Sequence, residues 1–476
     1  MVVYGADVDE LRQLAKAFGE AGARLTQAQG TVTAQVRSSP WGGPDAERFR
    51  HEWAGQHVAR LLAAARALES SATVLVKNAD EQERTSTDEG GGAGGAGGGA
   101  GAGGAGAGGG GGAGGGGADS GGHDGPLPTP EAGASADDAA AWWQSLSPAE
   151  QQAMIDSDPG LVGSLDGLPG AVRDEANRAV LADSIAELRA SPPASGDDYA
   201  LIAWVERLAA LENVQRVLDR TDGTTLLMFD PTAPGSPQVA IGFGDIDTAD
   251  HIGVYTQGMN SGVDGGGGLT GPTSDMVNLQ DELYQRLASA GDGETGAMVM
   301  WMGYDAPSPL TVAFPQQGEA GAADLADFAD GLRTNNDDAH ITGLGHSYGS
   351  FVTGLAGQQT GAFDDLVFFG SPGIGTSDIG DLRLDGGNAY VLEADGDPVA
   401  DAGRFGSDPN HLPGVINLGS DADGVLEGSS GHSGYLTDGT ASQYNMAAVV
   451  AGDGQDAGRG DNSGLGDALR WVLGQL

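Results

Sequence analysis

Residues 345–349 read Gly-His-Ser-Tyr-Gly, which places Ser347 at the centre of the pattern Gly-x-Ser-x-Gly. This pattern is typical of a nucleophile elbow, a tight turn between a strand and a helix that exposes a serine hydroxyl. Glycine accounts for 85 of the 476 residues, so the pattern by itself is weak. The flanking residues strengthen it, because 340–344 predict a buried strand and 350–355 predict the start of a helix. We therefore expect Ser347 to be a nucleophile held at the N-terminus of a helix, where developing negative charge is favoured.

A serine hydroxyl becomes nucleophilic when a base takes its proton and a carboxylate orients that base. In proteins with this elbow the chain order is serine, acid, histidine. Two histidines follow Ser347 in the sequence, His411 and His432. His432 stands in the glycine-rich stretch 431–435, before a helix predicted at 442–450, and we predict that it is the base. His411 comes directly after the loop expected to hold the acid, and we predict a structural role for it.

The orienting acid is expected where a strand ends at its carboxyl side. Residues 389–394 predict the penultimate strand, and Asp395-Gly396-Asp397-Pro398 form the turn that leaves it. Asp397 is the preferred acid and Asp395 is the main alternative. A further interpretation leaves both as turn-forming aspartates, which this acidic chain has in number.

Two backbone N–H groups are expected to stabilise the oxyanion of an acyl intermediate. One is that of Tyr348, directly after the nucleophile. The second is predicted to be that of Met259, in the loop that follows the strand predicted at 252–255. Gly258 would let this loop approach closely, although an ordinary glycine turn is the alternative interpretation.

The elements that must position these residues begin near residue 216. From there short apolar runs alternate with helical segments such as 275–287 and 322–333. Such alternation predicts an α/β fold with a mostly parallel sheet covered by helices on both faces. The predicted strands are Leu226–Phe229, Val239–Phe243, Ile252–Tyr255, Ala297–Met300, His340–Leu344, Leu366–Phe369 and Ala389–Glu393. We assign 216–476 to a catalytic domain and 138–215 to its helical N-terminal part, where Ser147-Pro148-Ala149-Glu150 is a capping box.

The N-terminal region differs in character. Residues 1–88 carry apolar residues at helical spacing on both sides of a turn at 38–44, which predicts an α-helical hairpin. Residues 90–118 are only glycine and alanine, so we predict a disordered linker over 89–137. An r.m.s. span of about 30 Å is expected for the glycine and alanine tract.

Trp41-Gly42-Gly43, in the predicted turn, is similar to the motif of the WXG family of helical hairpins, which are tied to actinobacterial type VII secretion. The resemblance implies pairing with a second small helical hairpin or a secretion component. That family's export signal, a tyrosine followed four residues later by an acid, has no match at 75–82, which puts export in doubt.

Residues 138–476 resemble an actinobacterial α/β-hydrolase family whose domain is generally catalogued as of unknown function. The resemblance rests on Trp142-Trp143, 165–169, 173–178, 258–260, 345–350 and 432–435. It implies the α/β-hydrolase fold and a triad of Ser347, Asp397 and His432, but no substrate.

Composition narrows the function further. The formal charge of −45 argues against nucleic-acid or anionic-membrane partners, and the absence of cysteine excludes disulfides and thiolate metal sites. No apolar stretch approaches the roughly 20 residues of a membrane span, and no cleavable signal peptide is recognised. Asp395–Asp397 and Asp421–Gly424 resemble calcium loops but lack the downstream glutamate, so neither metal nor cofactor is predicted.

The sequence therefore predicts a serine hydrolase, an esterase-like or lipase-like enzyme that acts on a small-molecule or lipid acyl substrate through an acyl-enzyme. An acyltransferase with the same residues is one alternative. Another is a type VII secretion-linked interaction protein whose hydrolase domain is cargo. A cytoplasmic and an exported location both stay open.

Overall fold

The computed structural model describes residues 129–130, 133–193, 198–263, 269–308, 311–312, 314–400 and 403–460, together with isolated positions between 12 and 76. The chain divides into two compact units, Met1–Leu127 and Pro128–Leu476. In the first unit the described positions are all helical. The predicted turn at Trp41-Gly42-Gly43, the pairing of two helices into a hairpin and the glycine and alanine linker lie outside the described residues.

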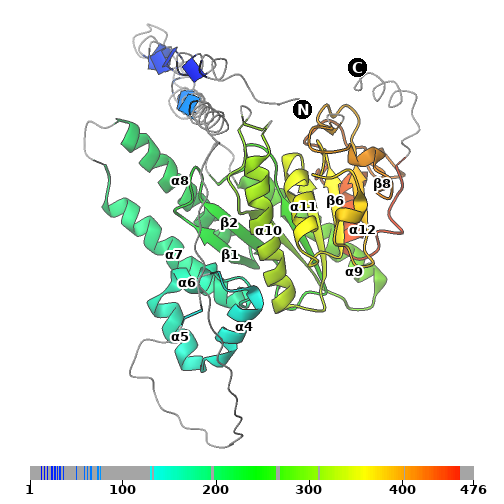
Figure 1. Ribbon diagram of the computed structural model, residues 1–476, viewed down its shortest axis with the longest axis horizontal. Coiled ribbons are helices and arrows are strands. Elements are labelled where there is room, and N and C mark those ends of the chain that lie inside the picture. Colours follow the sequence, from blue (N-terminus) through cyan, green and yellow to red (C-terminus); the bar gives the residue numbers. More distant parts are fainter. Residues whose placement is uncertain are drawn as a thin grey trace, which may run out of the picture. The chain divides into compact units, whose positions relative to one another are not determined.

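The second unit is built on one eight-stranded sheet (Figure 1). Its order is β1-β2-β4-β3-β5-β6-β7-β8, in which β1-β2 and β2-β4 are antiparallel and all other pairs are parallel. The strands are β1 Thr224–Asp230, β2 Gln238–Phe243, β3 His251–Thr256, β4 Gly296–Met302, β5 His340–His346, β6 Asp365–Phe369, β7 Ala389–Leu392 and β8 Ile416–Leu418. All seven predicted strands are present. The unpredicted β8 has three residues, too few to show a period.

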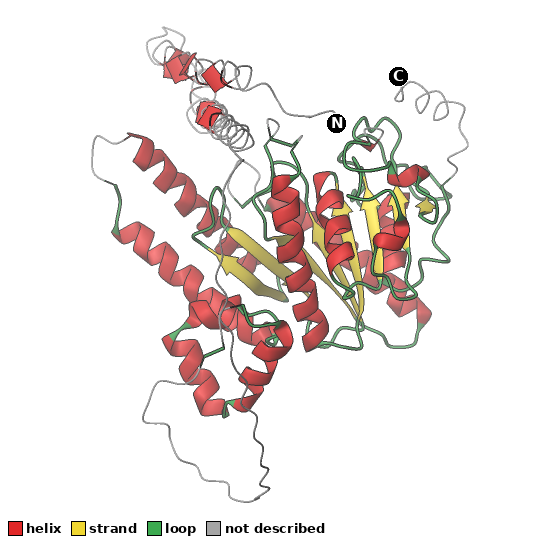
Figure 2. Cartoon of the chain, viewed as in Figure 1, coloured by secondary structure: helices red, strands yellow, loops and turns green. Residues whose placement is uncertain are grey.

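Helices cover both faces of this sheet, as Figure 2 shows. The helices are α4 Ala136–Ser145, α5 Pro148–Ser157, α6 Pro159–Ser164, α7 Gly170–Ala190, α8 Asp198–Arg220, α9 Thr270–Ala290, α10 Gln316–Asn335, α11 Tyr348–Gln359 and α12 Ala441–Val450, with 3-10 turns η2 Ile379–Asp381 and η4 Pro409–His411. Residues of α7, α8, α9 and α12 share one buried cluster, and residues of α10 and α11 share the other. The α/β fold predicted from the alternating pattern is confirmed.

Side-chain alternation along the strands produces these two clusters. In β4, Met298 and Met300 lie in the first cluster, whereas Val299 and Trp301 lie in the second. Successive side chains of a strand point to opposite faces, so a strand buried on both faces must be apolar throughout. This explains why the central strands read as continuous apolar runs.

Helix α7 joins the helical N-terminal part of this unit to the edge of the sheet. Asp174 accepts a hydrogen bond from the Leu226 N–H (2.6 Å), while Asn177 and Arg178 donate to the carbonyls of Leu226 and Thr224 (both 2.9 Å). Leu226 and Thr224 belong to β1, the first strand in the sheet order. Polar side chains of one helix therefore satisfy backbone groups of an edge strand.

The predicted capping box of α5 is present. The Glu150 N–H donates to the Ser147 hydroxyl, and the Ser147 N–H donates back to the Glu150 carboxylate at 2.8 Å. Trp143 is buried, and its helix α4 packs against α10.

Candidate active site

Ser347 lies in the turn between β5 and α11, where its backbone has φ 55° and ψ −130°. A positive φ is uncommon for a residue with a side chain and persists where surrounding contacts enforce it. The Ser347 N–H donates to the Phe369 carbonyl of β6 (3.0 Å), and the Ser347 carbonyl accepts from the Ser350 N–H (2.9 Å). These bonds hold the serine in the strand-to-helix turn that the sequence predicts.

Glycines on either side of Ser347 allow the strand and the helix to meet. A Cβ atom at Gly345 would lie 2.7 Å from the Ser350 Cα, and one at Gly349 would lie 2.7 Å from the Gln257 carbonyl oxygen. Neither position has room for a side chain. The two glycines of the pattern are therefore required by close packing.

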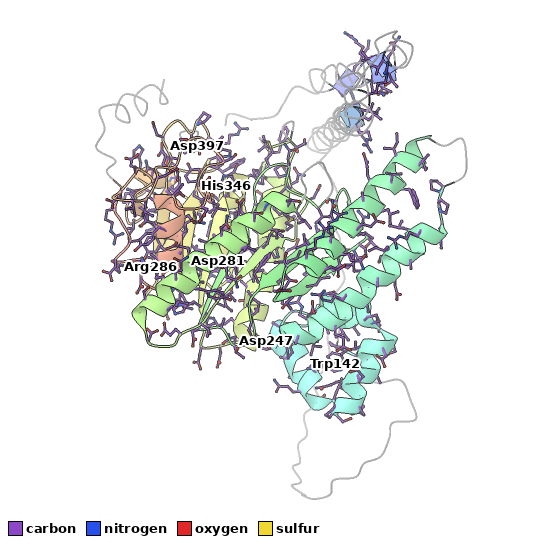
Figure 3. The ribbon with its side chains drawn as sticks, turned by 180° about the vertical axis from the view of Figure 1, so that it is seen from behind. Trp142, Asp247, Asp281, Arg286, His346 and Asp397 are labelled. Carbon is purple, nitrogen blue, oxygen red and sulfur yellow. The ribbon has the colours of Figure 1, made fainter. Side chains whose placement is uncertain are left out.

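A chain of hydrogen bonds starts at the Ser347 hydroxyl. The His432 Nε2 lies 2.8 Å from the Ser347 Oγ, and the His432 Nδ1 lies 3.0 Å from each carboxylate oxygen of Asp397. Ser347 and Asp397 are buried, whereas His432 is partly exposed. Three residues that are far apart in the sequence thus meet at the carboxyl edge of the parallel strands. Figure 3 shows His346, the neighbour of Ser347, and Asp397 at the same end of this unit, opposite Asp247.

The environment of Asp397 favours a carboxylate. Burial by itself raises the pKa of Asp397. Hydrogen bonds from His432, from the Tyr435 hydroxyl (2.7 Å) and from the Val399 N–H (2.9 Å) outweigh burial and hold that pKa below its ordinary value. A carboxylate that stays ionised can fix the tautomer and orientation of the imidazole beside it.

The sequence left Asp395 as an alternative acid, and His411 is the other histidine that follows Ser347. Their positions in the structure distinguish both from Asp397 and His432. Asp395 is exposed, and it is its backbone carbonyl that accepts the Gly431 N–H (2.9 Å). His411 is in η4, with its ring 4.0 Å from Asp408 and more than a third of its side chain exposed. Asp397 and His432 are therefore the residues that the structure brings to Ser347.

Two further residues lie beside the hydrogen-bond chain, His346 and Tyr435. The sequence analysis predicted no role for either of them. Tyr435 is buried, donates to Asp397 and accepts the Ala394 N–H through the same hydroxyl (2.9 Å). The His346 Nε2 lies 2.8 Å from the His432 carbonyl oxygen. Both lie within three residues of a candidate catalytic residue in the sequence, which is the only local signal that could have marked them.

The loop after β3 lies against the nucleophile. A Cβ atom at Gly258 would be 2.6 Å from the Ser347 Cβ and 3.0 Å from its Oγ, so the close approach expected of Gly258 is present. Met259 follows with a side chain that is 39% exposed, and the Asn260 N–H ties the loop to the Pro307 carbonyl at 2.9 Å. Directly after Ser347, the Tyr348 side chain is fixed by its hydroxyl, which donates to the Phe314 carbonyl (2.8 Å). The Tyr348 backbone follows Ser347 directly, and the Gly258 backbone that precedes Met259 lies against Ser347.

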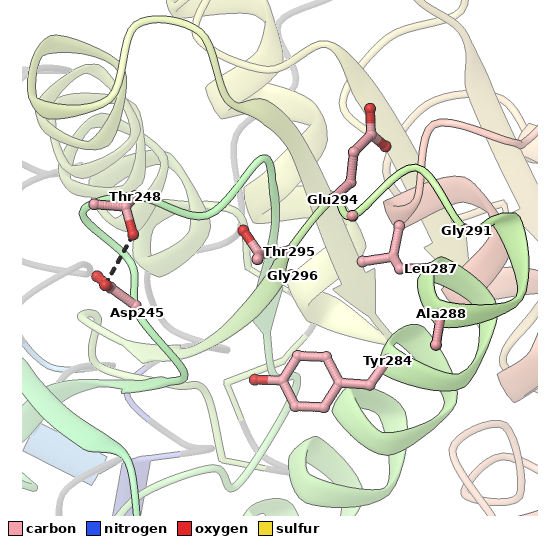
Figure 4. A pocket seen from close by; sticks show the side chains of 10 residues that line it. Asp245, Thr248, Tyr284, Leu287, Ala288, Gly291, Glu294, Thr295 and Gly296 are labelled. Carbon is pink, nitrogen blue, oxygen red and sulfur yellow. Dashed lines mark hydrogen bonds between the residues drawn. The ribbon is translucent and has the colours of Figure 1, made fainter.

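A surface pocket of about 540 Å³ lies elsewhere on this unit (Figure 4). It is lined by the end of α9 and by residues before β3 and around the start of β4, among them Tyr284, Asp245 and Glu294. Asp245 accepts a hydrogen bond from Thr248 at 2.8 Å. Parallel strands start at this edge of the sheet and end at the opposite edge beside Ser347, so the pocket is separate from the hydrogen-bond chain.

Two features are absent from the residues that the structure describes. In that part of the chain no group of three or more histidines, aspartates and glutamates is arranged to hold a metal ion. Within the same residues, no helix combines the length and the apolar character that a bilayer crossing requires.

A mostly parallel sheet between two helical layers, with a serine on a strained turn at its carboxyl edge, defines an α/β hydrolase. The family model described as alpha/beta hydrolase matches residues 230–407. An uncharacterized protein of Mycobacterium bovis is 34% identical over 221 residues, which cover 45% of this chain and 83% of that protein. The chain belongs to the alpha/beta hydrolase family.

Other similarities are more distant or partial. An uncharacterized protein of Mycobacterium tuberculosis is 30% identical over 381 residues, covering 69% of this chain and 57% of that relative. The chain thus spans little more than half the length of this relative. Among solved structures, a predicted hydrolase from Thermoplasma acidophilum has a TM-score of 0.28 at 14% identity, covering 46% of this chain and 92% of its own. An acylaminoacyl peptidase from Pyrococcus horikoshii has a TM-score of 0.29 at 11% identity, covering 50% and 42%.

Proposed function

We propose that the protein is a serine hydrolase that cleaves esters or related acyl compounds through an acyl-enzyme. The observation that supports this proposal is the continuous hydrogen-bond chain from the Ser347 hydroxyl through His432 to Asp397. A base within 2.8 Å of a serine hydroxyl, itself oriented by a buried carboxylate, is the arrangement that activates a serine.

In the proposed reaction each residue has one task. The His432 Nε2 accepts the proton of Ser347 as the Ser347 Oγ attacks the acyl carbon, and then donates it to the leaving group. Asp397 holds the Nδ1 proton of His432 and stabilises the imidazolium that forms. A water molecule that is deprotonated by His432 then attacks the acyl-enzyme, releases the acid and restores Ser347.

The oxyanion of the tetrahedral intermediate would be held by the amides of Tyr348 and Met259. Both belong to segments that touch Ser347, and the Tyr348 amide starts α11, so the helix dipole favours the negative charge there. Removing a single donor of this kind typically costs roughly 100- to 1,000-fold in rate.

The first test is covalent labelling of the full-length chain with a fluorophosphonate probe. We expect labelling of the wild-type protein and none of Ser347→Ala, with His432→Ala reduced by at least roughly 100-fold because the base is lost. His411→Ala and Ser433→Ala are matched controls, since each removes the same side-chain type from a nearby loop. A folded wild-type protein that does not label, or labels equally in Ser347→Ala, would rule the proposal out.

A further inference from the structure

His346 occupies a position between the strand that carries the nucleophile and the loop that carries the base. It is the last residue of β5, and its ring stacks on Phe369 of β6 with 5.1 Å between centroids. The ring centroids of His432 and Tyr435 lie 4.9 Å and 6.0 Å from that of His346. The imidazole of His346 is thus enclosed by aromatic side chains next to the proposed base.

The polar contact of this ring is to the backbone of the base itself. The His346 Nε2 lies 2.8 Å from the His432 carbonyl oxygen. A carbonyl only accepts, so Nε2 must carry a proton and act as the donor. Burial of the ring, together with the neighbouring His432, lowers the pKa of His346 to about 4. The ring therefore stays neutral at neutral pH and adds no positive charge beside His432 when that residue is protonated in catalysis.

The other side of the same loop is held by a second hydrogen bond. The Gly431 N–H donates to the Asp395 carbonyl at 2.9 Å, directly before His432. Successive residues of the loop are thus tied to two different strand ends, Gly431 to the turn after β7 and His432 to the end of β5. Losing the His346 contact would remove the hydrogen bond that ties the backbone of His432 to the end of β5.

From these contacts we infer that His346 is a positioning residue, which donates a hydrogen bond to the His432 backbone and keeps the His432 imidazole in line with Ser347. The inference rests on the proposed function, because it concerns how that base is held. The hydrogen bond that His346 donates goes to the His432 backbone, whereas the His432 Nε2 faces the Ser347 hydroxyl. His346 acts through the loop that carries His432, and its contribution is to the orientation of the His432 imidazole.

The test compares three side chains at this position in the full-length protein. His346→Phe keeps a ring against Phe369 but removes the donor, whereas His346→Gln keeps an N–H donor at a similar reach. We expect His346→Phe to lower the rate constant of fluorophosphonate labelling roughly 10- to 100-fold, as a displaced catalytic group does. His346→Gln is expected to recover most of the wild-type rate. With an ester substrate, kcat should fall in His346→Phe while KM changes little.

A matched control lies at the other end of the same strand. His340 begins β5 and pairs with Asp365 at 3.3 Å, at the edge of the sheet opposite to Ser347. His340→Phe and His340→Gln should change the melting temperature without changing the labelling rate. The inference is overturned if folded His346→Phe labels at the wild-type rate, or if His346→Gln is as slow as His346→Phe. Failure of the proposed function looks different, because the wild-type protein would then not label at all.

Discussion

At the scale of single residues, the hydrogen bonds that Asp397 accepts affect both the stability of the fold and the proposed catalytic reaction. The carboxylate is buried, and three donors lower its pKa against the opposing effect of burial. A group whose pKa is lower in the folded than in the unfolded state stabilises the fold at pH values above its unfolded pKa. That stabilisation is lost as the pH falls through the folded pKa.

Tyr435→Phe should therefore destabilise the protein in a pH-dependent manner. The substitution removes the 2.7 Å hydrogen bond to Asp397 and lets the pKa of Asp397 rise. We expect urea unfolding at neutral pH to show a loss of about 1.5–3 kcal/mol, the usual contribution of a hydrogen bond to a charged group. The difference should shrink as the pH falls below the ordinary pKa of an aspartate and through the lowered pKa of Asp397, where the carboxylate becomes protonated in both variants. Tyr284→Phe, at an exposed tyrosine that contacts Gln280, is the control and should change little. An effect of Tyr435→Phe that is independent of pH would contradict this account.

Gly370→Ala tests the space around the acid and the base. Gly370 has φ +56°, and a Cβ atom there would lie 2.9 Å from an Asp397 carboxylate oxygen and 3.1 Å from the His432 Nδ1. We expect labelling of Ser347 to fall at least roughly tenfold because the pair must move apart. Gly386→Ala has the same backbone strain at φ +83° with open space around its Cβ, so it should keep the wild-type labelling rate. Equal labelling of the two variants would mean that the clash is relieved without disturbing the pair.

At the scale of elements, the loop after β3 and the loop before α10 each carry an exposed apolar side chain. Met259 follows β3 and Phe314 precedes α10, and their side chains are 39% and 44% exposed. The Asn260 to Pro307 hydrogen bond joins these loops, and the Phe314 carbonyl accepts from the Tyr348 hydroxyl. We propose that these apolar groups border the acyl site of the proposed hydrolase, which would favour an acyl group that is itself apolar.

Met259→Asp and Phe314→Asp should therefore reduce activity on long acyl esters more than on acetyl esters. Each methylene that loses an apolar contact contributes about 0.8 kcal/mol, or roughly fourfold in kcat/KM. Measuring kcat/KM over a series of p-nitrophenyl esters checks this expectation. Leu201→Asp, at a similarly exposed apolar residue of α8, should leave the chain-length preference unchanged. A uniform loss over all chain lengths would argue for a different role of these side chains.

Most elements of the second unit were predictable because their signals are local. Strand runs, the capping box and the glycines around Ser347 depend on neighbours in the sequence, and the structure has them where they were expected. Asp395 and Asp397 could not be separated, since both belong to one turn and only the folded chain buries one of them. The contacts of His346 and Tyr435 join segments about 40 to 90 residues apart, and no spacing rule encodes such contacts.

At the scale of the whole molecule, the complete hydrogen-bond chain lies in the unit Pro128–Leu476. We predict that a fragment of residues 128–476 labels with fluorophosphonate at the wild-type rate.

A fragment that starts at 216 should fail to fold, because it lacks α7. The buried Arg173 of that helix contacts Asp166 at 2.8 Å and lies over the Phe328 ring of α10. Circular dichroism and labelling of both fragments check this. A folded, reactive 216–476 fragment would show that the helical part is dispensable.

The side chains of α7 that contact β1 also affect whether another chain can pair with this edge strand. A terminal strand with unsatisfied N–H and C=O groups is a template on which another chain can add a strand. Here Asp174, Asn177 and Arg178 occupy groups of Thr224 and Leu226, so an incoming strand would have to displace them. Changes that weaken this helix should therefore first appear as self-association through β1, with time-dependent turbidity and growing oligomers, before the expected labelling of Ser347 is lost.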